Sequence, residues 1–97
     1  MADIINFKAF EALTVSNSSV GFTTATVGVN DHAFLTVEDA AVRFRLDGSA
    51  PTATVGHELE EGDTLRLESM NEVSNFRAIR RDGVDATIQA SFGVKGA

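Results

Sequence analysis

Six arginines are the side chains best suited to specific chemistry in this sequence, and all of them lie between residues 43 and 81. A guanidinium group is planar, binds carboxylates through two parallel hydrogen bonds and tolerates burial in interfaces better than a lysine does. We expect Arg43, Arg45 and Arg66 to point outward from strands. They either meet an acidic surface of a partner protein or pair with acids of this chain, such as Glu68 and Glu72. The first alternative makes these three arginines candidate partner-interface residues.

The histidines and the acidic runs are the other groups that could act as catalysts or ligands. His32 and His57 are the only histidines, and neither belongs to an H-E-x-x-H motif. The G-x-S-x-G elbow and the phosphate-binding loop are also missing, although a Ser–His–Asp arrangement formed in space stays open. The acidic run from His57 to Asp63 lacks the pattern of a calcium loop. We therefore predict no catalytic, cofactor-binding or metal-binding residues, and we do not expect an enzyme.

The composition limits the classes of partner. The 97 residues fit a single domain, residues 1–97, and the absence of cysteine fits a reducing compartment. A net charge of −6 disfavours direct contact with nucleic acid, because phosphate contacts require cations. No apolar run is long enough to cross a membrane, and the N-terminus lacks the pattern of a secretory signal. The absence of Trp and Tyr disfavours a sugar-binding site.

Alternation of apolar and polar residues with a period of two is the dominant pattern. It predicts antiparallel strands that have one buried and one exposed face. In Val42–Leu46, for example, three apolar residues alternate with two arginines. Asp47-Gly48 and Gly62-Asp63 are typical of the turns between strands. The predicted strands cover residues 20–29, 34–37, 42–46, 64–68, 75–80 and 86–92.

These elements predict an all-β fold, namely a small antiparallel β-sandwich or a jelly-roll-like barrel of about seven to eight short strands. Residues 1–19 form either the first strand or an arm that adds a strand to a neighbouring subunit. One helical turn is predicted at Met70–Ser74. A bulge near Ala78 would bring Phe76 and Ile79 into phase with their strand.

From Ala33 to Phe92 the order of elements resembles that of small virion structural proteins of tailed bacteriophages. The resemblance begins with residues 34–48, which contain the stretch VRFRLDG, and continues through residues 51–57, PTATVGH. It then includes Gly62-Asp63, residues 75–80 (NFRAIR) and the final strand of residues 86–92. About two thirds of the chain takes part, and the first thirty residues do not.

Proteins of this kind are small β-sandwiches that decorate or cement the head shell. The resemblance therefore implies a capsid decoration protein that binds the major capsid protein on the exterior of the virion. It also implies a symmetric homo-oligomer, for example a trimer, that is made in the host cytoplasm and has no cofactor and no membrane or nucleic-acid partner. A neck, tail or fibre component of the virion is the alternative, and a module that binds a host surface is a third possibility.

Overall fold

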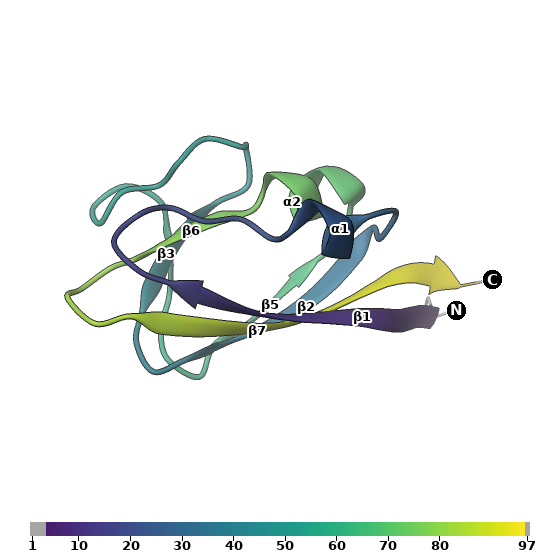
Figure 1. The fold of residues 1–97 in the computed structure, drawn as a ribbon, viewed down its shortest axis with the longest axis horizontal. Coiled ribbons are helices and arrows are strands. Elements are labelled where there is room, and N and C mark those ends of the chain that lie inside the picture. The colour runs from purple at the N-terminus through teal and green to yellow at the C-terminus, as the bar shows by residue number, and fades with distance from the viewer. Residues whose placement is uncertain (1–3, 97) are drawn as a thin grey trace.

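Two antiparallel sheets form the protein, and the computed structural model describes them over residues 4–96 (Figure 1). The four-stranded sheet has the order β1-β7-β2-β5, and the three-stranded sheet has the order β4-β3-β6. This arrangement confirms the predicted all-β fold. The elements are β1 (Ile4–Val15), α1 (Thr24–Val27), β2 (His32–Glu38), β3 (Val42–Arg45), β4 (His57–Leu59), β5 (Thr64–Leu67), α2 (Met70–Asn75), β6 (Arg77–Arg80) and β7 (Ala86–Gly96).

The hydrophobic core lies between the two sheets. Leu35 and Ile88 from the four-stranded sheet and Val42 from the three-stranded sheet belong to one cluster of buried side chains. Each strand contributes alternate residues, as the period of two predicted. Phe76 is fully buried and stacks on both Phe22 and Phe44, with ring centroids 5.0 and 5.6 Å apart. The edge-on contact of Phe22 with Phe92 of β7, with ring centroids 4.9 Å apart, completes a chain of phenylalanine rings from one sheet to the other.

The prediction of a strand at residues 20–29 is wrong. The segment has one isolated bridge, between Val20 and Ala78, and then forms the short helix α1. The carboxylate of Glu11 accepts hydrogen bonds from the backbone N–H and the hydroxyl of Thr23, directly before this helix. Gly28 ends the helix at a φ of 48°. These contacts override the β-propensity of the Thr- and Val-rich segment, since local preference yields to tertiary context.

The helical turn predicted at Met70–Ser74 is confirmed as α2. Ser69 caps this helix, and its hydroxyl accepts a hydrogen bond from the backbone N–H of Glu72. Because α2 continues to Asn75, β6 begins only at Arg77 and pairs with β3 in a regular register. The bulge predicted near Ala78 is therefore wrong. The burial of Phe76 at the end of α2 explains why it did not fit the alternation of the strand.

The first strand, β1, pairs with β7 along its whole length, from Ile4 opposite Gly96 to Val15 opposite Ala86. The register shifts once, between Phe7 and Ala9. Of the two predictions for the N-terminal segment, the structure has the first strand of the chain's own sheet. The molecule measures 43 × 24 × 23 Å, because β1 and β7 run for 12 and 11 residues and extend beyond the other strands (Figure 1).

Candidate functional site

A row of aligned residues crosses the outward surface of the four-stranded sheet. Phe10 of β1 lies opposite Ser91 of β7. Ser91 lies in turn opposite Phe34 of β2, and Phe34 lies opposite Arg66 of β5. We call these four residues the outer row. Their neighbours in sequence, such as Leu35, point into the core, so the outer row faces away from it.

The seven phenylalanines divide into two groups. Three of them are exposed, and all three belong to the four-stranded sheet: Phe7, Phe10 and Phe34, which are 47%, 60% and 37% exposed. The other four pack in or against the core. Exposed aromatic rings grouped on one sheet have little value for the stability of the fold, but they are typical anchors of protein–protein interfaces.

Arg66 differs from the other five arginines in its surroundings. Arg43, Arg45, Arg80 and Arg81 each form an ion pair with an acid of this chain, and Arg77 donates hydrogen bonds to Ser19. Within residues 4–96, no hydrogen bond or ion pair involves the Arg66 side chain, which is exposed. Arg66 is thus the arginine whose guanidinium group is available to a carboxylate of a partner.

A second row lies beside the outer row and contains no charge. Ala12 lies opposite Gln89, Gln89 opposite Thr36, and Thr36 opposite Thr64. The eight positions of the two rows therefore hold one charged side chain, the cation Arg66, in a chain with a net charge of −6. We call these eight residues the outer face. The carboxylate of Glu38 borders the outer face, where it accepts a hydrogen bond from Gln89. Within the outer face itself, Arg66 is the one group that would attract an acidic partner.

The other two predicted interface residues lie on the other sheet. Arg43 and Arg45 belong to β3, and both are partly buried. The structure therefore brings Arg43 and Arg45 together but places Arg66 apart from them. Arg43 donates hydrogen bonds to the carbonyl oxygens of Ala53 and Gly56, each at 2.9 Å, and to the carboxylate of Glu58 at 2.8 Å. Its fork holds the loop of residues 46–56 against the strand.

We expect Arg43→Ala to loosen this loop. The loss of three hydrogen bonds from a charged donor should lower the free energy of unfolding by about 1–2 kcal/mol, since Arg43 is partly screened by solvent. Limited proteolysis should then cut residues 46–56 faster, and urea unfolding should give the change in stability. Arg43→Lys keeps the charge without the fork and should recover only part of the loss. Equal stability of all three proteins would show that the fork does not hold the loop.

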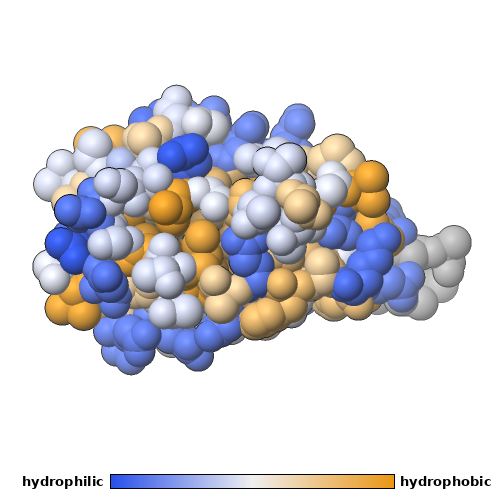
Figure 2. Space-filling view, in the orientation of Figure 1, coloured by the Kyte–Doolittle hydropathy of each residue, from blue (hydrophilic) through white to orange (hydrophobic). Residues whose placement is uncertain are grey.

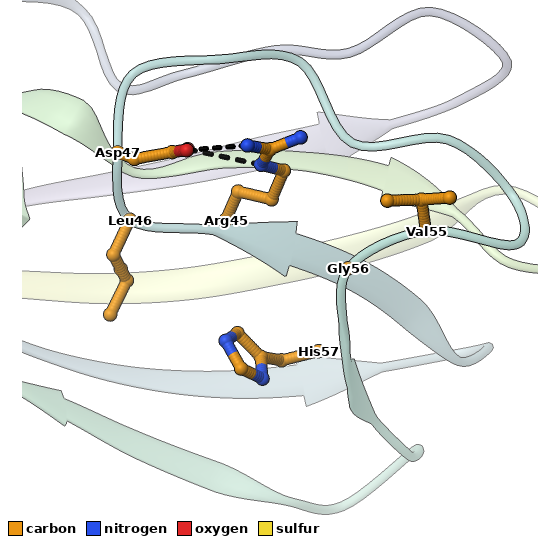
Figure 3. A pocket seen from close by; sticks show the side chains of 6 residues that line it. All are labelled: Arg45, Leu46, Asp47, Val55, Gly56 and His57. Carbon is orange, nitrogen blue, oxygen red and sulfur yellow. Dashed lines mark hydrogen bonds and ion pairs between the residues drawn. The ribbon is translucent and has the colours of Figure 1, made fainter.

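The same loop borders an open hollow of about 570 Å³ (Figure 3). The side chains of Arg45 and Asp47 meet at its border and form two parallel hydrogen bonds, between Nε and Oδ1 and between Nη2 and Oδ2. His57 lies below them and packs its ring on Phe44. The hydrogen bonds from Arg45 lower the pKa of Asp47 from its ordinary value of 3.8, and the backbone N–H of Ser49 adds to this effect. The charged groups of the hollow thus satisfy each other.

The lowered pKa of Asp47 predicts acid sensitivity of this loop. The unfolded chain takes up this proton at a higher pH than the folded chain does, so stability is present above the ordinary pKa and is lost as the pH falls through the folded pKa. We expect the free energy of unfolding to fall as the pH drops below about 4. Asp47→Asn should make this fall shallower in urea titrations at stepped pH. The pKa values of Asp31 and Asp85 are also lowered, by His32 and by Ser16 and Arg80, so part of the fall should persist. If the free energy of unfolding depends on pH in the same way in the variant and in the unaltered protein, Asp47 does not contribute to the acid sensitivity.

The remaining candidate ligands lie apart. His32 contacts Asp31 at 2.7 Å, whereas His57 belongs to the hollow. Among the residues described, no three His, Asp or Glu side chains are placed to hold a metal ion together. None of the helices in the described part of the chain has the length and apolar character needed to cross a membrane.

Sequence reasoning missed Phe10 and Phe34 as site residues. Phe34 lies between Ala33 and Leu35, and this apolar run hides which residues point outward. The alternation of the strand nevertheless indicates that Phe34 points outward, because Leu35 and Val37 lie on one face and Phe34 must lie on the other. The outward position of Phe10 was harder to predict, since the apolar residues of Ile4–Leu13 fit a helix as well as a strand.

Comparisons with known proteins gave no relative. No family model matches the chain, and neither the curated proteins nor the solved structures contain a match.

Proposed function

We propose that this protein decorates the head shell of a tailed bacteriophage and binds its major capsid protein through the outer face. The single observation that supports a binding role is the grouping of exposed Phe10 and Phe34 with the unpaired Arg66 in one row. The resemblance of residues 33–92 to small virion proteins supplies the choice of partner. Phenylalanine and arginine are both enriched in protein interfaces relative to the rest of the surface.

The proposed mechanism is a clamp on neighbouring shell subunits. Each contact is modest, because the outer face offers a small area and one charge. Contacts of a homo-oligomer with several shell subunits at once would combine their affinities and resist expansion of the shell. The acidic remainder of the surface would keep many copies from aggregating on the exterior of the particle.

Co-sedimentation of the purified protein with empty heads from the same source tests this proposal. We expect binding to saturate at a fixed number of copies per shell subunit. Absence of binding to heads, together with a few copies per virion, would contradict decoration and assign the protein to the neck, the tail or a fibre. Binding to host cells in place of heads would assign it to the host surface.

A further inference from the structure

The open edge of β1 is the longest unpaired backbone edge of the two sheets. β1 lies at the end of the order β1-β7-β2-β5, so that β7 covers one of its edges only. Within residues 4–96, no backbone hydrogen bond joins the other edge to a further segment. The nearby Thr23 meets β1 through the side chain of Glu11. In Figure 1 the strand lies on the reader's side of the sheet, while β5 fades behind it.

The two halves of β1 differ as pairing edges. The register shift between Phe7 and Ala9 places Lys8 at an irregular position, and bulges and lysines are devices that discourage pairing at an edge. Ala9–Val15 is regular and has no proline, no glycine and one charge, Glu11. Figure 2 shows weakly hydrophobic residues on the surface along which β1 runs in Figure 1. This half of the edge is therefore a template for another strand.

We propose that a second copy of this chain pairs with Ala9–Val15, antiparallel and with Ala12 opposite Ala12 on a twofold axis. Antiparallel pairing requires facing residues to share a face, and this register satisfies that requirement over all seven residues of the regular run. Phe10 then lies opposite Thr14 of the second copy, an aromatic and β-branched pair of the kind that stabilises sheets. Glu11 lies opposite Leu13, so that the two glutamates do not oppose each other.

The lengths of the edges identify the occupant as β1 of the second copy. The opposite edge of the same sheet is β5, which has only four residues, Thr64–Leu67. A ring in which β1 of one copy pairs with β5 of the next would leave most of the long edge open. Pairing of two β1 strands uses the whole regular run and gives a dimer instead of the trimer that the resemblance suggested.

The role that we give to the dimer rests on the proposed function, whereas the pairing of the two β1 strands does not. Two sheets joined at β1 form one sheet of eight strands, with both outer faces on the same side. The exposed ring of Phe10 would be partly covered, and two copies of Arg66 would lie at the far ends. A dimer with two outer faces would bind a repetitive shell more tightly than one face could.

A charge-exchange experiment on Ala12 tests the pairing with purified protein alone. We expect the unaltered protein to sediment as a dimer that dissociates on dilution. Ala12→Lys and Ala12→Glu should each weaken the dimer roughly tenfold, because each places like charges opposite each other on the axis. An equimolar mixture of the two variants should form a heterodimer, since Lys then faces Glu. Ala12 is exposed, so both variants should keep their far-UV circular dichroism.

The matched controls are Thr64→Lys and Thr64→Glu, at the far end of the same row on β5. They change the charge of the outer face equally and should leave the dimer unchanged. A protein that is monomeric at all concentrations, a trimer, or a mixture of Ala12 variants that does not reassociate would each overturn the proposal. Loss of dimerisation in the Thr64 variants would indicate pairing of β1 with β5.

Salt separates a failure of this pairing from a failure of the proposed function. Two chains of net charge −6 repel each other, so added salt should strengthen the dimer. The contribution of Arg66 to head binding should instead shrink with salt, because a contact between a guanidinium group and a carboxylate is screened. A dimer without head binding would contradict only the proposed function, and head binding by a monomer would contradict only the pairing.

Discussion

We expect the double variant Phe34→Ala, Arg66→Gln to bind empty heads about a hundredfold more weakly than the unaltered protein. Both residues belong to the outer row, and together they remove an aromatic anchor and the one arginine with no partner in the described chain. Truncation of a residue that dominates an interface costs about 2 kcal/mol or more, although such losses are not additive. A combined loss near 3 kcal/mol corresponds to the hundredfold change. Co-sedimentation over a range of protein concentrations gives the dissociation constant.

Arg45→Gln is the matched control for this variant. It also removes one guanidinium group, but from the three-stranded sheet, where Arg45 is bound by Asp47. We expect it to bind heads like the unaltered protein. If Arg45→Gln loses binding while the double variant retains it, the contact lies on the three-stranded sheet, to which two of the three predicted interface residues, Arg43 and Arg45, belong.

We expect Phe76→Ala to lower the free energy of unfolding by about 3–5 kcal/mol, the largest effect of any single change considered. Phe76 has no exposed surface, and its ring is stacked between Phe22 of one segment and Phe44 of β3. Removal of the ring leaves a cavity at the point where the two sheets and α2 meet. Such a loss is a large part of the stability of a domain of this size. Urea unfolding followed by circular dichroism measures it.

Phe34→Ala provides the comparison, because it removes the same ring from the outer face. Phe34→Ala should lower the free energy of unfolding by about 1 kcal/mol, so that the double variant used in the head-binding test remains folded. Similar losses for Phe76→Ala and Phe34→Ala would contradict the division of the phenylalanines into a core group and a surface group.

Much of the fold could be predicted from local patterns. Alternation located β3, β5 and β7, because each of these strands has one face in the core and one in solvent. The short strand predicted at residues 34–37 lies within β2. The capping pattern of Ser69 and Glu72 fits the one predicted turn of helix. α1 could not be predicted in this way, since its start depends on Glu11, which is 12 residues away from Thr23.

The candidate site was harder to predict than the fold. The sequence identified the arginines as the informative cations, but their partners are remote. Arg43 binds Glu58 and Arg81 binds Glu60, which lie 15 and 21 residues away, and neither is one of the acids that the sequence suggested. Arg66 has no such partner in the described chain, and it aligns with Phe10 and Phe34. Both facts depend on the strand order and register, which cannot be read from a single sequence.

The long pairing of β1 with β7 determines how the domain would respond to mechanical force. Ile4 and Gly96 lie opposite each other at one end of the ribbon (Figure 1). Tension applied between the two ends of the chain would load the hydrogen bonds of this pair one after another, because they run perpendicular to the strands. The strands would separate like a zipper at low force. Tension that enters through the outer face would instead load many bonds together, so a durable attachment to a particle is better made through that face than through either end of the chain.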